Sequence, residues 1–207
     1  EVEAVEYLLA GGDNQRAAEM MEQLLKVLFG RSELITLAHW AEVLPTDVLA
    51  THPTLCTGLA WAANATSHVA LCEKLIGIVE DWAGLTAEKF ITLSVEEQQA
   101  LPADTLGAMV ELTVLQARLT LDQGNLVAIL NQYSRILPYL TRERDTLPFI
   151  YNYPSVLRPP MVFMIAMAEE LMGNISQAEK DFAEAAHTAQ ESDNIHIIAL
   201  GLGHLGQ

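Results

Sequence analysis

Apolar residues recur along this chain with the spacing of an α-helix. In the first segment they fall three or four residues apart, at Ala17, Met20, Met21, Leu24, Leu25 and Leu28. A second set has the same spacing and ends at a proline: Leu34, Leu37, Ala38, Ala41, Leu44 and then Pro45. Such residues share one face of a helix, whereas no stretch alternates with the two-residue period of a strand. The pattern predicts roughly ten helices and no sheet.

Four short connectors between the predicted helices are similar to one another. They begin at Gly12, Ala65, Gly124 and Gly173, and are therefore 49 to 59 residues apart. Glycine suits the left-handed end of a helix, and the Asp, Thr or Asn that follows can cap the next helix. Repeated helix pairs bury a core by stacking against their neighbours. We therefore expect an all-α, right-handed superhelix of antiparallel, tetratricopeptide-like helix pairs, with additional helices at 31–44 and about 86–101.

One long segment, 138–160, interrupts this pattern. Its five prolines, Pro138, Pro148, Pro154, Pro159 and Pro160, are expected to break any helix there. Aromatic residues are interleaved with arginines: Tyr139, Phe149, Tyr151 and Tyr153 with Arg142, Arg144 and Arg158. Long irregular segments in compact domains are often functional. The segment is either a binding loop or a packed connector whose aromatic rings fill the gap between two repeats.

The C-terminal end of the chain is apolar. Residues 194–207 contain no charged side chain, although the last repeat of a natural helical array should be polar on its outer face. The chain also begins with Glu1 rather than methionine. These features predict that 1–207 is a single helical-repeat domain and part of a longer, multidomain chain.

Charge limits the partners of this segment. Lys and Arg number 11 and Asp and Glu number 27, which gives a formal net charge of −16. Binding to nucleic acid requires clustered basic residues, and an anionic membrane surface repels such a chain, so we expect neither contact. The uncharged stretch 48–72 is interrupted by His, Pro and Asn, which favours a buried helix pair over a membrane span. Cys56 and Cys72 are expected to be buried thiols in a reducing, cytoplasmic compartment.

The two ends of the chain carry a recognisable pattern. It consists of Gly12-Asp13 with Ala17-Ala18, Ser32-Glu33-Leu34 with Leu37, Trp40 and Leu44-Pro45, His52-Pro53 with Leu55 and Ala60-Trp61, and later Gly173-Asn174 with Gln177-Ala178-Glu179, Phe182 and Ala185-Ala186. This pattern resembles the helical-repeat region of MalT-like, LuxR-type large ATP-binding transcriptional regulators. The resemblance covers about half of the chain. Ala41 stands where that family usually has Leu, and Gly30-Arg31-Ser32-Glu33 spreads the family's Gly-Glu-Leu by two residues.

The resemblance implies a cytoplasmic regulator with an N-terminal NTPase module and a C-terminal helix-turn-helix. The helical region between them would bind a small-molecule inducer or a regulatory protein and couple that event to the other domains, with possible self-association. It would carry no chemistry of its own. A plain tetratricopeptide-like scaffold for protein–protein interaction is the alternative.

Motifs for chemistry are sparse. No phosphate-binding loop is present, and Gly201-Leu202-Gly203-His204-Leu205-Gly206 matches a dinucleotide fingerprint without the strand and helix that such a site needs. The six histidines lack metal-ligand spacing. We therefore expect no catalytic residue, cofactor or metal in this segment.

One set of charged residues has helical spacing. Glu111, Arg118 and Asp122 are seven and four residues apart, so at 100° per residue they fall on one stripe of a helix. A stripe on the concave face could bind a polar ligand, with Arg118 as the bidentate donor, or it could be a charge network on a solvated face. Arg158 is the fourth candidate for ligand binding. Trp40 and Trp61 are expected to pack between helices.

Overall fold

The computed structural model describes residues 2–141 and 154–191, and each regular element in these ranges is a helix. The prediction of an all-α chain is therefore confirmed for the described residues. The chain divides into two compact units, 1–86 and 87–207. A single domain over 1–207 and a tetratricopeptide-like superhelix remain predictions.

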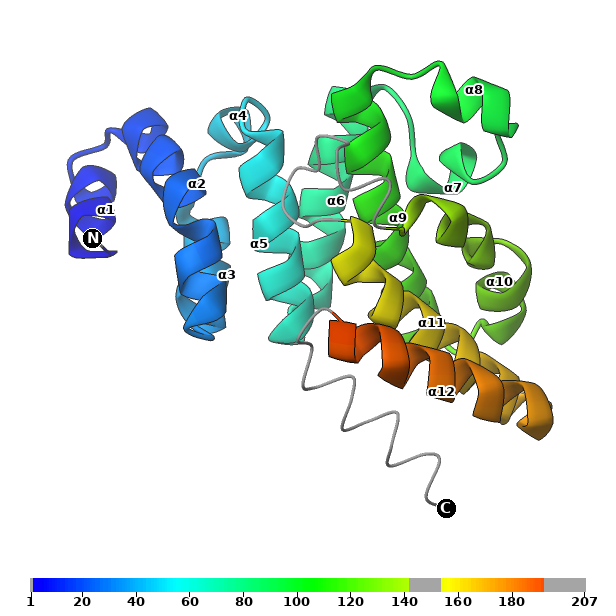
Figure 1. The fold of residues 1–207 in the computed structure, drawn as a ribbon. Helices are drawn as coiled ribbons and strands as arrows, with labels where there is room; N and C mark the ends of the chain where they lie inside the picture. Colours follow the sequence, from blue (N-terminus) through cyan, green and yellow to red (C-terminus); the bar gives the residue numbers. More distant parts are fainter. Residues whose placement is uncertain (1, 142–153, 192–207) are drawn as a thin grey trace. The chain divides into compact units, whose positions relative to one another are not determined.

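The first unit is made of six helices that pack mainly as sequence neighbours (Figure 1). They are α1 (Val2–Ala10), α2 (Asn14–Gly30), α3 (Leu34–Val43), α4 (Thr46–Leu49), α5 (Pro53–Ala65) and α6 (Val69–Ala83). Trp40 of α3 is fully buried, and its indole Nε1 donates a hydrogen bond to Glu6 Oε1 of α1 at 3.0 Å. The prediction that Trp40 packs between helices is confirmed. The 48–72 stretch forms the end of α4, all of α5 and the start of α6, as a helix pair.

The second unit is built around a long helix, α9 (Ala103–Asp122). Leu106 to Leu115 are all buried, so this helix is enclosed on every side over that part of its length. The other elements are α7 (Ala87–Phe90), α8 (Val95–Gln99), α10 (Leu126–Asn131), the 3-10 helix η1 (Tyr133–Tyr139), α11 (Pro154–Leu171) and α12 (Ile175–Glu191). The additional helix expected near 86–101 is present as two short helices, α7 and α8.

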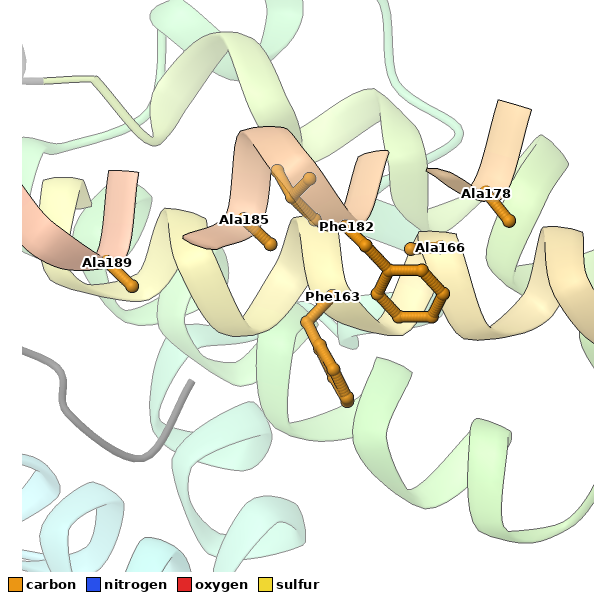
Figure 2. Close-up of a cluster of buried hydrophobic side chains, with 7 residues drawn as sticks. Phe163, Ala166, Ala178, Phe182, Ala185 and Ala189 are labelled. Carbon is orange, nitrogen blue, oxygen red and sulfur yellow. The ribbon is translucent and has the colours of Figure 1, made fainter. Parts of the chain in front are cut away.

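Helices α11 and α12 lie side by side as an antiparallel pair (Figure 1). Ala178, Ala185 and Ala189 of α12 are buried against α11, and the rings of Phe163 and Phe182 meet with centroids 5.4 Å apart (Figure 2). Alanine lets two helix backbones approach closely, and the tilted aromatic pair fills the remaining space. Apolar burial along this seam holds the pair together.

The helix pairs are joined by turns of one design. At Gly12, Gly124 and Gly173 the backbone is left-handed, with φ of 76°, 75° and 84°. In each turn the N–H of the following residue bonds the carbonyl five positions back, as in Asp13 N to Leu8 O at 3.0 Å. This hydrogen-bond pattern is the Schellman motif, which ends a helix at a residue with a left-handed backbone. Asp13 and Asn125 then cap the next helix with their side chains.

The connector predicted at Ala65 is shifted by two residues. Helix α5 continues to Ala65, and the Thr66 hydroxyl donates back to Ala62 O at 2.8 Å instead of capping α6. The left-handed position is Ser67, with φ of 62°, and His68 precedes α6 without a side-chain cap. The expectation that Thr66 caps the next helix is therefore wrong. The sequence pattern did not reveal this shift, because serine occupies the left-handed position that glycine occupies in the three other turns.

Proline does not break the helix that begins at Pro154. Helix α11 continues through Pro159 and Pro160 to Leu171, so the expectation that these two prolines break any helix is wrong. Pro154 is the first helical residue, where its missing N–H is harmless. The later pair removes two helical hydrogen bonds, but Leu157 and Met161 beside it are buried, and that burial offsets the loss. Residues 142–153 and the apolar end with its glycine motif, 194–207, lie outside the described residues.

Within the described ranges, no helix has both the length and the apolar character needed to cross a bilayer.

Candidate functional site

The predicted charged stripe on α9 is split between two environments. Glu111 is fully buried, whereas Arg118 and Asp122 are about half exposed and form an ion pair with each other at 3.2 Å. The three residues therefore do not form one open surface, and the expectation that Glu111 shares an exposed stripe with Arg118 is wrong. Helical spacing placed all three on one side of α9, but it could not show that the packing around Leu106 to Leu115 covers Glu111.

Arg158 has structural partners in the second unit. Its Nη1 donates to Leu137 O of η1 at 3.2 Å, and its Nη2 donates to the Glu184 carboxylate of α12. The side chain therefore joins η1 to the α11–α12 pair. The structure brings together Arg118 and Asp122 but places Arg158 in this separate contact. Ligand binding by any of the four residues remains a prediction.

A cavity of about 410 Å³ opens in the second unit beside α8 and η1. Its walls come from the loop that follows α7, from α8 and from η1. The lining residues are Ile91, Leu93, Ser94, Val95, Gln98, Gln99, Arg135, Pro138 and Tyr139. This volume lies within the range of small-molecule sites, which combine apolar walls with a few fixed polar groups.

Gln98 and Tyr139 form a rigid polar part of the wall. The Tyr139 hydroxyl donates to Gln98 Oε1 at 2.7 Å, and Gln98 Nε2 donates to Phe90 O at 2.9 Å. Gln98 and Tyr139 are both buried, and the Phe90 and Tyr139 rings lie 6.5 Å apart at a tilt of 54°. Because both ends of the amide are bonded, α8 is fixed to η1 and to the end of α7.

The loop that enters α8 is fixed by its own hydrogen bonds. Ser94 Oγ accepts from Glu97 N at 3.2 Å, and the Glu97 carboxylate accepts from Ser94 N at 2.8 Å. This reciprocal capping box defines where α8 begins. It also engages the Glu97 carboxylate in a local contact, and within the described part of the chain no carboxylate lines the cavity.

Arg135 is the one charged residue among the described residues that line the cavity. Its Nη1 donates to Ile91 O at 3.4 Å, across the cavity wall. A guanidinium has five N–H groups, so this single bond leaves donors for a ligand. Of the arginines in the described residues, Arg16, Arg31, Arg118 and Arg158 each pair with a carboxylate, and Arg135 does not.

Sequence reasoning found only part of this site. Pro138 and Tyr139 belong to the proline-rich segment that the sequence singled out, and both line the cavity. Gln98 and Arg135 were missed. Gln98 lies within a run of polar residues, Glu96 to Gln99, which is typical of a solvated helix, and Arg135 is a lone basic residue, so neither carries a motif. Only the packing of α8 against η1 reveals them.

A second, partly buried polar cluster lies in the first unit and has a structural role. His52 is 8% exposed; its Nε2 lies 2.8 Å from Gln15 Nε2, and its Nδ1 lies 3.2 Å from Glu22 Oε2. An amide nitrogen only donates, so Nε2 accepts and the Nδ1–H donates to Glu22. His52 thereby fastens the start of α5 to α2.

Both cysteines are buried and free, as predicted. Burial raises the pKa of the Cys56 thiol to about 12, with a smaller contribution from the nearby Glu22 carboxylate. Burial likewise raises the pKa of Cys72 to about 12, helped by Glu73. Both groups are therefore neutral thiols at physiological pH. Within residues 2–141 and 154–191, no three His, Cys, Asp or Glu side chains gather as a metal site would require.

Comparison of the chain with models of known families, with curated proteins and with solved structures finds no match in any of the three. The function proposed below therefore rests on the residues and their geometry.

Proposed function

We propose that this chain is the effector-binding and coupling segment of a cytoplasmic transcriptional regulator, similar in plan to the helical-repeat region of MalT-like, LuxR-type regulators. In this proposal the segment performs no chemistry. The cavity beside α8 and η1 is the observation that carries it. Its polar groups, Arg135, Gln98 and Tyr139, are ones that bind and orient a ligand.

The contacts of η1 supply a route for coupling. One side of η1 lines the cavity through Arg135 and Tyr139. The Leu137 carbonyl on the same short helix accepts from Arg158, which also pairs with Glu184 of α12. A ligand that restrains η1 would therefore also restrain the α11–α12 pair. Coupling of this kind requires a measured effect at the second place, not proximity alone.

Hydrogen exchange on the intact chain tests this proposal. A panel of small metabolites is first screened for compounds that raise the melting temperature, since a ligand selective for the folded state stabilises it. A bound compound should slow exchange in α8 and η1 and also in α12. Arg158→Gln should keep the protection in α8 and η1 but lose it in α12. Protection confined to α8 and η1, or protection of α12 that persists in Arg158→Gln, would refute the coupling route.

The alternative function is a scaffold that docks protein segments. If no small compound stabilises the chain but peptides do, the scaffold explains the cavity better. Sequencing the complete reading frame adds an independent test. The regulator plan requires a phosphate-binding loop upstream and a helix-turn-helix downstream, and the scaffold requires neither.

A further inference from the structure

We propose that the cavity beside α8 and η1 binds a small monocarboxylic acid with an apolar body, and that Arg135 holds the carboxylate. This inference rests on the proposed effector-binding function and names the chemical class of the effector. The supporting observation is the charge of the cavity lining, where, of the residues that the structure describes, Arg135 alone is charged.

The environment of Arg135 favours an external anion. The chain carries 27 acidic against 11 basic residues, so a surface arginine has many carboxylates to pair with. The four other arginines of the described ranges each do so, whereas Arg135 is held only by the Ile91 carbonyl. A guanidinium that keeps its fork of donors available, on a wall with no carboxylate, is suited to bidentate capture of an incoming carboxylate.

The rest of the lining sets the character of the ligand. Ile91, Leu93, Val95, Pro138 and the Tyr139 ring present apolar surface around Arg135. Val95 is 55% exposed, so a ligand with an apolar body would cover surface that otherwise faces water. Phosphate carries nearly two charges at neutral pH and needs several charged donors, whereas this lining supplies one cation. A singly charged carboxylate therefore matches the lining better than a phosphate does.

Gln98 supplies a second contact for the same ligand. Its amide nitrogen carries two hydrogens, of which one is given to Phe90 O. The side chain is 6% exposed and fixed at its oxygen by the Tyr139 hydroxyl. The remaining N–H is thus held in place without further loss of side-chain entropy, which favours binding by a preorganised donor. Arg135 and Gln98 together would bind the carboxylate of the ligand, and the apolar lining residues would cover its hydrocarbon part.

Matched acids and amides test the inference on the intact chain by titration calorimetry. The probes are acetate, isovalerate and hydrocinnamate, each beside its neutral amide. We expect isovalerate or hydrocinnamate to bind, acetate to bind more weakly, and each amide to lose about tenfold or more, the factor for a charge-assisted hydrogen bond. Arg135→Gln should cause the same loss for the acids, and Arg135→Lys a smaller one. Arg16→Gln, a surface arginine of the other unit paired with Asp13, is the matched control and should change nothing.

The outcomes separate this inference from the function on which it rests. Equal binding of acid and amide, or unchanged acid binding by folded Arg135→Gln, would overturn the carboxylate assignment while leaving an effector-binding function intact. Loss of acid binding in Arg118→Gln but not Arg135→Gln would move the site to α9 and overturn the assignment as well. Binding only of a peptide with a free C-terminus, and not of its amide, would show a carboxylate site but refute a small-molecule effector. If neither these acids nor any screened metabolite binds, both proposals fail.

Discussion

Two glycines inside helices should respond in opposite ways to the same substitution. Gly58 of α5 is buried against α2, and a Cβ built on it would lie 2.8 Å from Leu25 Cδ1 and 2.9 Å from Cδ2. Gly77 of α6 has no atom within 4 Å of its Cβ position. Each change to alanine gains about 1 kcal/mol of helix propensity, so the surroundings decide whether the substitution raises or lowers the free energy of unfolding.

The magnitude at Gly58 follows from the room that Leu25 has to move. Leu25 is 2% exposed, so its methyl groups are enclosed and cannot simply turn into solvent. Overpacking of this kind costs about 1–3 kcal/mol. After the gain in propensity, Gly58→Ala should lower the free energy of unfolding by about 1 kcal/mol, whereas Gly77→Ala should raise it by about 0.5–1 kcal/mol.

Urea unfolding followed by tryptophan fluorescence measures both variants in the relevant unit. All three tryptophans of the chain lie in residues 1–86, at positions 40, 61 and 82. The unfolding midpoint should fall for Gly58→Ala and rise for Gly77→Ala, with the slope m unchanged. In a Leu25→Ala background, Gly58→Ala should become neutral or stabilising, because the new methyl group then occupies vacated space. If Gly58→Ala stabilises the original chain as much as Gly77→Ala does, the close contact between α2 and α5 is refuted.

Three further predictions follow from the turns, the cysteines and the α11–α12 seam. Ser67→Gly should stabilise the first unit by about 1 kcal/mol in the same fluorescence assay, since serine is strained at φ 62°. Gly124→Ala should lower the midpoint of thermal unfolding followed by circular dichroism, since alanine is strained at φ 75°. The stability that the protonated thiols of Cys56 and Cys72 contribute should be complete below pH 9 and fall as pH rises toward 12, because the folded chain holds protons that the unfolded chain releases. Cys56→Ala should flatten this decline in the free energy of unfolding. An unchanged dependence of that free energy on pH would contradict the raised pKa of Cys56. Phe182→Ala should cost about 3–5 kcal/mol and speed hydrogen exchange along α12, and exchange like that of the original chain would exclude a packed seam.

Most of the helices could be predicted from the sequence, because helix formation depends on residues that are close together along the chain. Residues three and four apart share a helix face, so apolar spacing located most helices without knowledge of their neighbours. Glycine at positions 12, 124 and 173 marked the left-handed turns because it alone adopts positive φ without strain. The same rule failed at Ser67, where the closure of the turn imposes a conformation that the residue itself disfavours.

The candidate site was decided by tertiary packing. Spacing placed Glu111 with Arg118 and Asp122, but which side of α9 meets other helices depends on contacts distant in sequence. The cavity joins Gln98 and Tyr139, 41 residues apart, and one hydrogen bond fixes that distance in space. The spacing of apolar residues shows only which residues share a face of one helix. A site whose residues come from several helices depends on how those helices pack, and that packing is driven by the burial of apolar surface.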